Sequence, residues 1–131
     1  MSVYPFVNPL MKMTANISST FTLIFGNDQH TCFIDSILVT NTSDLAIDIT
    51  LTVAREEIIG QEDYYKLAFN VPIKSKERID ILQGQALTFQ AGDLLYANTD
   101  FNGGTCDIFV IYRELLETTP TAKTGVKTNG R

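Results

Sequence analysis

The chain has 131 residues, of which 44% are apolar and 19% charged, and its net charge at pH 7 is −5. This length fits one domain, and the apolar content is that of a globular protein rather than a disordered chain. The acidic balance and scattered basic residues argue against a nucleic-acid surface, and no apolar run reaches the roughly 18–20 residues that span a bilayer.

Residues 1–13 form an apolar segment with no regular periodicity and with prolines at positions 5 and 9. The segment lacks the basic start and apolar stretch of a secretory signal, so we expect synthesis in the cytoplasm. We interpret it as an extended arm that seeks a groove on a neighbouring subunit, with packing on its own domain as the alternative. Aromatic and methionine side chains supply large contact areas. The expected anchors at a subunit interface are Tyr4, Phe6, Val7, Leu10 and Met11.

Period-two alternation of apolar and polar residues predicts short antiparallel strands in the next part of the chain. Residues 20–25 are predicted to place three side chains on one face of a strand: Phe21, Leu23 and Phe25. Residues 31–40 are apolar on both faces, which is typical of a central strand covered on both sides. Residues 45–54 give the clearest alternation, with one face that packs and one that can meet water.

Residues 55–63 are ambiguous, because their composition suits a helical turn and a long loop equally well. Residues 64–71 alternate again and end at Pro72, which removes a ladder donor and favours an edge strand or a strand end. Four more strands are predicted at residues 78–82, 86–90, 94–99 and 105–113.

Three glycine-containing turns separate the later strands, and the first is Gln83-Gly84. At Gly92-Asp93, the glycine is expected to adopt the unusual backbone angle and the aspartate to hydrogen-bond nearby amides. At Asn102-Gly103-Gly104, a tight hairpin turn is expected, because these residues tolerate a positive φ. The predicted structural turn residues are Gly92, Asp93, Gly103 and Gly104.

About eight closely spaced strands predict an all-β fold, an antiparallel β-sandwich or jelly roll. The predicted organisation is an N-terminal arm over residues 1–13, a sandwich domain over residues 14–117 and a C-terminal tail over residues 118–131. The tail is rich in threonine and offers only Ala122 and Val126 for burial. We expect such a polar segment to be mobile on its own.

The sequence offers no catalytic signature and no set of metal ligands. The only histidine, His30, lies near Asp28 and Cys32, and we interpret it as a residue at the edge of a loop. Four carboxylates share one polar loop instead of facing each other across a cleft. They are Glu56, Glu57, Glu62 and Asp63, for which weak calcium binding is the remote alternative. We therefore predict no catalytic residues, no metal and no cofactor.

The two cysteines, Cys32 and Cys106, lie in predicted strands. Two cysteines are too few for a disulfide scaffold or a four-ligand zinc site. Buried thiols are the preferred interpretation, and a single disulfide between strands is the alternative.

Residues 83–97, with the Gly92-Asp93 turn between two strands, resemble a pattern found in small structural proteins of tailed bacteriophages. In those virion β-sandwiches the pattern follows a segment like residues 37–43 and an alternating strand like residues 45–53. The resemblance covers roughly residues 31–113. It implies a non-enzymatic subunit located in the virion, in capsid decoration or in the neck or tail, whose partners are other virion proteins and copies of itself.

A carbohydrate-binding or receptor-binding module is the rival interpretation, because sandwiches host many functions. It requires exposed aromatic side chains near polar groups, and the chain contains no tryptophan. The candidate aromatic residues are Tyr64, Tyr65, Tyr96 and Phe101. An enzyme is not expected, since no acid, base and nucleophile converge in the sequence.

Overall fold

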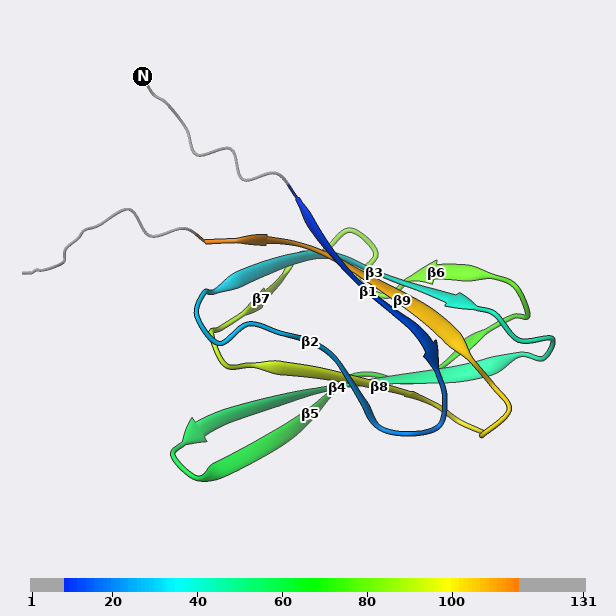
Figure 1. The fold of residues 1–131 in the computed structure, drawn as a ribbon, viewed down its shortest axis with the longest axis horizontal. Coiled ribbons are helices and arrows are strands. Elements are labelled where there is room, and N and C mark those ends of the chain that lie inside the picture. The colour runs from blue at the N-terminus through cyan, green and yellow to red at the C-terminus, as the bar shows by residue number, and fades with distance from the viewer. Residues whose placement is uncertain (1–8, 116–131) are drawn as a thin grey trace, which may run out of the picture.

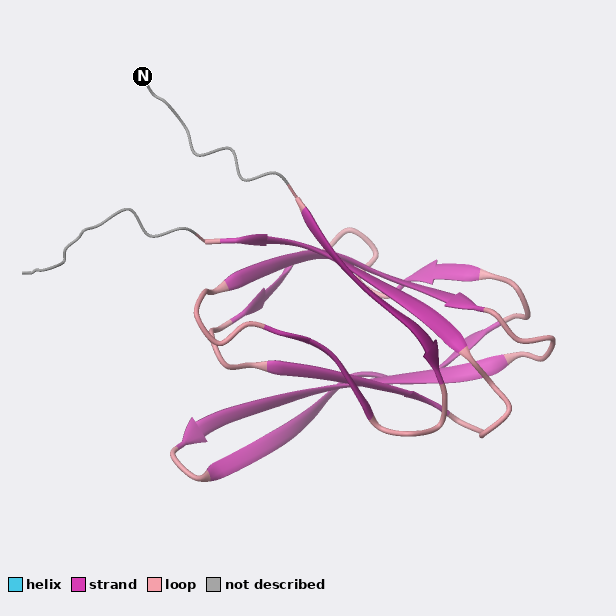
Figure 2. Ribbon diagram, viewed as in Figure 1, coloured by secondary structure: helices cyan, strands magenta, loops and turns pink. Residues whose placement is uncertain are grey.

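The computed structural model describes residues 9–115, which form two antiparallel sheets packed face to face (Figure 1). Within this range the chain forms nine strands and no helix (Figure 2), so no helix there can cross a bilayer. The strands are β1 (Leu10–Ile17), β2 (Thr22–Gly26), β3 (Cys32–Asn41), β4 (Ile47–Ile58), β5 (Gln61–Ile73), β6 (Arg78–Asp80), β7 (Leu87–Phe89), β8 (Leu94–Thr99) and β9 (Cys106–Glu114). The predicted all-β sandwich is confirmed.

The first sheet has the strand order β1-β9-β3-β6, with β7 also paired to β3, and the second has the order β2-β8-β4-β5. The core lies between them and is built from alternate residues of each strand. Along β9, for example, Cys106, Ile108 and Val110 are buried while the residues between them are half-buried. Burying one such aliphatic side chain contributes about 1.5–3 kcal/mol.

Strand β1 changes the predicted boundary between arm and domain. Its first residue, Leu10, is in register with Tyr112 of β9, and Met13 is in register with Phe109. Residues 10–13 therefore belong to the sheet, and the domain begins before residue 14. The sequence hid this strand because its outward residues are methionines, so no polar face marks the alternation. Residues 1–8 and 116–131, including Tyr4, Phe6, Val7 and the predicted tail, lie outside the described residues.

Residues 55–63 form neither a helical turn nor a long loop. Strands β4 and β5 continue through this segment as a hairpin that closes at Ile59 and Gly60, whose φ is 84°. Arg55 is in register with Asp63, and Ile58 with Gln61. The hairpin projects from one end of the sandwich (Figure 1). Both of its faces meet water there, so the period-two signal disappears.

The segment predicted as a strand at residues 20–25 does not place its three apolar side chains on one face, and β2 begins only at Thr22. Phe25 is buried, whereas Phe21 and Leu23 are 47% and 50% exposed. The register with β8 shifts between Leu23 and Phe25, which leaves Ile24 as an extra residue. A bulge of this kind moves the following side chain to the opposite face.

The Gly92-Asp93 turn has the predicted geometry: Gly92 has a φ of 96°, and Asp93 accepts a hydrogen bond from the amide of Gln90 at 2.9 Å. A turn lies at Asn102-Gly103-Gly104, as expected, with the Gly104 amide donating to the Phe101 carbonyl at 3.0 Å. It is not a hairpin, because β8 and β9 lie in different sheets, and neither glycine has the expected positive φ. Gly104 is needed for space instead. A Cβ atom there would lie 2.7 Å from Ile47 Cγ2.

Cys32 and Cys106 are both free and buried, as the preferred interpretation expected. Cys32 is in register with Glu114, and Cys106 with Asn41. The two thiols thus sit at opposite ends of the β3–β9 pair, about 30 Å apart at the rise of a strand. A disulfide needs Cα atoms roughly 4.4–6.8 Å apart, so this register excludes a bridge within the chain.

Candidate functional site

Titratable side chains do not converge in the part of the chain that the structure describes. No group of three or more His, Cys, Asp or Glu side chains could hold a metal ion there. His30 lies in the loop between β2 and β3, as predicted, and its amide donates to Asn27 Oδ1 at 3.0 Å. Nothing in this geometry assembles a base, an acid and a nucleophile around one point.

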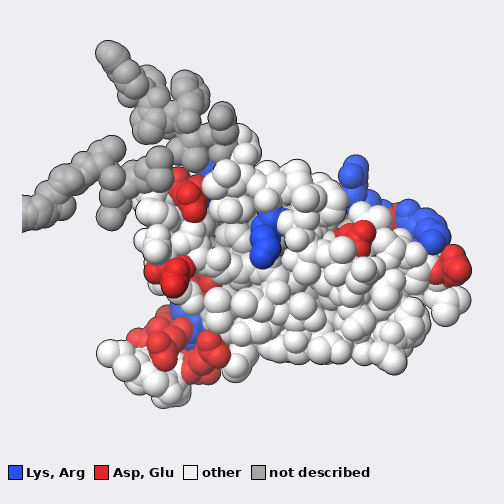
Figure 3. Space-filling model, in the orientation of Figure 1, with Lys and Arg blue, Asp and Glu red and all other residues white. Residues whose placement is uncertain are grey.

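The predicted acidic cluster lies on the projecting β4–β5 hairpin. Figure 3 shows the acidic side chains gathered at that end of the molecule. The hydroxyl of Tyr64 donates to Glu62 Oε1 at 2.7 Å, and the hydroxyl of Tyr65 donates to Glu57 Oε1 at 3.3 Å. The hydrogen bond to Glu62 raises the pKa of Tyr64, and the charge of Glu57 raises the pKa of Tyr65. These carboxylates hold neighbouring tyrosines and do not face each other across a cleft.

The two thiols are unsuited to nucleophilic chemistry. Burial, with a smaller contribution from Asp107, raises the pKa of Cys106 to about 12. Burial and then the charge of Glu114 raise the pKa of Cys32. The thiolate is the reactive form of cysteine, and the folded protein suppresses it at both positions.

One ion pair fixes the root of the hairpin to the Gly92-Asp93 turn. The Arg55 guanidinium donates to Asp93 from Nε at 3.0 Å and from Nη2 at 2.7 Å. The Asp93 side chain is only 3% exposed, and the hydrogen bond to it raises the pKa of Arg55. The pair therefore orients the hairpin relative to β8.

The outer side of the β1–β9–β3 sheet carries an apolar surface, which we call the methionine face. Its residues point away from the core. In β9 they alternate with the buried residues, and in β1 and β3 they are in register with these outward residues of β9. Met11 and Met13 are 53% and 62% exposed. The methionine face consists of Met11, Met13, Leu38, Phe109 and Ile111. It contains Met11, one of the two predicted interface anchors among the described residues, whereas Leu10 lies on the opposite side of β1.

The outer side of the other sheet carries an aromatic cluster, which we call the aromatic face: Phe21, Leu23, Tyr64 and Tyr96. The rings of Phe21 and Tyr96 are stacked with their centroids 4.3 Å apart, and Tyr64 approaches Phe21 edge-on at 6.4 Å. Leu23 is in register with Tyr96. Sequence reasoning missed Phe21 and Leu23, because the bulge that separates their outward side from the inward side of Phe25 leaves no signal in the residue pattern.

The four aromatic candidates for a glycan site do not form one surface. Tyr64 and Tyr96 lie on the aromatic face. Tyr65 follows Tyr64 directly in β5 and so points to the opposite side of the strand. Phe101 packs against the core in the turn that contains Gly104. Only two of the candidates are brought together.

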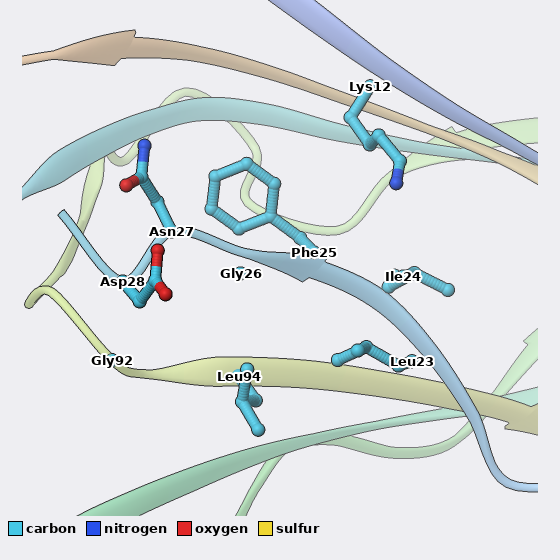
Figure 4. Close-up of a pocket in the computed structure, with 9 residues that line it drawn as sticks. All are labelled: Lys12, Leu23, Ile24, Phe25, Gly26, Asn27, Asp28, Gly92 and Leu94. Atoms are coloured by element: carbon cyan, nitrogen blue, oxygen red, sulfur yellow. The ribbon is translucent and has the colours of Figure 1, made fainter. Parts of the chain in front are cut away.

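The two long sides of the sandwich are open, and each has a cavity. The cavity on the β1–β2 side measures 320 Å³. Its residues are Lys12, Leu23, Ile24, Phe25, Gly26, Asn27, Asp28, Gly92 and Leu94. Lys12 enters from β1 and Asp28 lies at the far end, with Phe25 between them (Figure 4). The amine and the carboxylate are thus separated and form no acid–base pair.

The cavity on the opposite side measures 440 Å³ and lies between β5 and β6. We call it the β5–β6 groove: Leu67, Ala68, Val71, Pro72, Ile79, Asp80, Ile81 and Gln83. Its apolar side chains are half-buried and pack directly on the core, apart from the exposed Pro72. Both cavities fall in the size range of small-ligand pockets, roughly 300–1,000 Å³.

Residues 9–115 thus present two apolar outer faces, an acidic hairpin and two open sides, and they contain no group of three His, Cys, Asp or Glu side chains that could hold a metal ion. Contiguous exposed apolar surface of this kind is typical of interaction sites. No protein-family model matches the chain, and comparison with curated proteins gives no match.

Proposed function

We propose that the protein is a non-enzymatic structural subunit of a phage particle, which binds copies of itself and neighbouring virion proteins in capsid decoration or in the neck or tail. The observation that carries the proposal is the methionine face. Outward positions of a sandwich sheet are ordinarily polar, yet here Met13, Phe109 and Leu38 form one cross-strand row on the outer surface.

Side-chain chemistry supports a protein partner for this face. Methionine and aromatic residues are enriched in protein interfaces, and contiguous apolar surface marks interaction sites. Unbranched methionine side chains can also adjust to a partner's surface. Met11 and Met13 project from an edge strand, where a neighbouring subunit can approach closely. The resemblance of residues 83–97 to phage proteins, with its Gly92-Asp93 turn, supports a virion as the setting.

Sedimentation velocity over a range of concentrations tests the proposal. The full chain is expected to form a defined oligomer, and the double variant Met11→Lys/Met13→Lys is expected to shift it to monomer. A control with the same added charge is Gln85→Lys/Gln90→Lys, at two exposed positions outside the face. A full chain that remains monomeric at every concentration and behaves like the double variant would contradict the proposal.

Glycan binding is the second candidate, and the aromatic face favours it. The stacked pair Phe21–Tyr96 and the nearby Tyr64 offer ring surface. Lys66 Nζ lies 3.5 Å from Thr52 Oγ1 in the cross-strand row that contains Tyr96. A glycan array with the full chain and with Phe21→Ala tests this candidate. Binding that Phe21→Ala abolishes would favour it, and an array without signal would eliminate the glycans tested.

A further inference from the structure

We propose that the β5–β6 groove receives residues 3–7 from the N-terminal segment of a second copy of this chain. The inference rests on the proposed function, since it requires copies to meet, and it adds the receiving site for the predicted arm. It is carried by the lining of the groove, by the composition of the segment that precedes Pro9, and by the distance that this segment can cover.

The groove is a part of the core whose inward apolar side chains are only half-buried. Ile79 is in register with the buried Val39, and Ala68 with the buried Leu51, so both point inward between the sheets. They are nevertheless half-buried, because β5 and β6 are the last strands of their sheets. Inward apolar side chains at an open edge lose contact area that an inserted side chain would restore. The groove therefore suits apolar side chains from another segment.

The edges of the groove favour side-chain insertion over the addition of a strand. Asn70 in β5 has a φ of 50°, and Pro72 has no amide to donate. A regular ladder cannot continue along this part of β5. A segment that contains prolines loses few backbone hydrogen bonds by binding there, because it also lacks some of its backbone amide donors.

The N-terminal segment has the matching composition. It contains Val3, Tyr4, Phe6 and Val7, with Pro5 among them. The proline fixes an extended backbone angle and reduces the entropy lost on binding. The C-terminal segment 116–131 is a poor occupant, because it is mostly polar and offers few apolar side chains. The occupant is thus expected to be residues 3–7.

Chain length favours a second copy over the same copy. Phe6 precedes Leu10 by four residues, which span at most about 14 Å. Three strand spacings separate β1 from β6, which is already about 14 Å across the sheet. Leu10 lies in the same cross-strand row as Ile34 of β3. The groove residue Ile81 donates its amide to the carbonyl of Ile37, which lies about 10 Å further along β3. Phe6 and Val7 would also have to cross the edge of β6, so their backbone falls short of the groove of the same copy, and residues 3–7 cannot occupy it there as one segment.

The resulting contact is heterologous, since the β1 side of one copy donates and the β5–β6 side of the next receives. Repetition of such a contact closes a ring or builds an open chain, depending on the rotation between copies. The two sides lie at opposite edges of the sandwich, so one copy can donate and receive at the same time.

A fluorescent peptide of residues 1–9 provides the first test, with a chain of residues 9–131 as the receiver. This chain retains every described residue. The peptide is expected to bind, and Ala68→Glu in the receiver is expected to weaken binding at least tenfold. Phe69→Glu is the matched control, because Phe69 is 64% exposed, next to Ala68, and outside the groove. Circular dichroism checks that each receiver is folded.

Disulfide trapping gives a second measurement that does not depend on Ala68→Glu. One chain carries Phe6→Cys and another carries Ile81→Cys, and a covalent dimer is expected only when the two are mixed. Replacing the acceptor by Phe69→Cys is expected to abolish the dimer. The buried native thiols are common to all samples.

The outcomes separate this inference from the proposed function. An oligomeric full chain whose peptide does not bind and whose mixture does not cross-link overturns the inference and leaves the proposed function standing. A cross-link formed within one chain that carries both substitutions also overturns the inference. A small apolar molecule that occupies the groove and is not displaced by the peptide overturns it as well. A monomeric full chain without peptide binding counts against both.

Discussion

At the residue scale, the close approach of Gly104 to two side chains fixes the turn between β8 and β9. A Cβ at Gly104 would lie 2.7 Å from Ile47 Cγ2 and 3.0 Å from the ring of Phe101. Both neighbours are packed, and Ile47 is 1% exposed. Gly103 differs, because its nearest neighbour would be at an ordinary 3.5 Å.

Gly104→Ala is therefore expected to lower the free energy of unfolding by about 1–3 kcal/mol, the usual cost of overpacking. Gly103→Ala is the control and is expected to change stability far less. Urea unfolding followed by circular dichroism measures both. Equal losses in the two variants would show that the contact with Ile47 is not the cause.

The buried thiol of Cys106 makes stability sensitive to alkaline pH. Its pKa is about 12 in the folded protein, against an ordinary value of 9.0. Below pH 9 the thiol is neutral in both states and contributes no pH dependence. Above pH 9 only the unfolded chain ionises, so the free energy of unfolding falls, by at most about 1.4 kcal/mol per pH unit for one thiol.

Cys106→Ala is expected to remove this contribution. The stability difference between the native chain and the variant should shrink as pH rises from about 8 to about 10.5. Urea unfolding at each pH measures the difference, and the tyrosines and lysines common to both proteins cancel. A difference that stays constant with pH would contradict the prediction.

At the element scale, the β4–β5 hairpin depends on its anchor to the Gly92-Asp93 turn. Asp93 accepts hydrogen bonds from Arg55 and from the Gln90 amide while almost fully buried. The comparable pair between Arg113 and Asp35 lies on the surface, where its hydrogen bonds lower the pKa of Asp35. The two pairs have the same chemistry and differ in burial.

Asp93→Ala is expected to cost about 1–3 kcal/mol, because it leaves Arg55 and a backbone amide without an acceptor. Asp35→Ala is expected to cost much less, since exposed ion pairs are weak. Amide hydrogen exchange should show faster exchange at the hairpin root in Asp93→Ala alone. Uniform protection in both variants would rule out the anchoring role.

The sequence predicts those strands best in which one face packs and the other meets water. Residues 45–54 alternate cleanly and fall within or beside β4, and residues 31–40 match β3. The hairpin at residues 55–63 could not be predicted in this way, because beyond the sandwich neither face is buried. Its strand structure comes from the pairing of Arg55 with Asp63 and of Ile58 with Gln61, which local composition does not reveal.

The two apolar outer faces are predictable from the sequence only in part. The sequence identifies Met11 as an apolar anchor, but its place in a sheet depends on pairing with Ile111, a contact between distant parts of the chain. Phe109 and Ile111 alternate with equally apolar buried residues, so residue type alone cannot assign the outer face of β9. The bulge at Ile24 is likewise a property of the assembled sheet.

At the scale of the whole molecule, the methionine face and the acidic hairpin lie on different sheets. Apolar side chains cover the methionine face, whereas one group of carboxylates lies on the projecting hairpin of the other sheet (Figure 3). If the methionine face drives association, its strength should follow the hydrophobic effect and not ionic attraction.

Self-association is accordingly expected to persist or strengthen in sodium sulfate, which favours burial of apolar surface. The control variant Glu56→Gln/Glu62→Gln removes two hairpin charges and is expected to leave the oligomer unchanged. Sedimentation velocity at low and high salt provides the measurement. Dissociation at high salt would point to an electrostatic contact instead.

The irregular edge of β5 has a consequence for copies that are crowded together. Asn70 and Pro72 interrupt its backbone, and the register with β4 shifts at several points. An edge of this kind is a poor template for the endless cross-β stacking that converts apolar sheet proteins into fibrils. The protein can thus expose apolar surfaces at high local concentration, because the exposed edge of β5 resists the stacking of strands into fibrils.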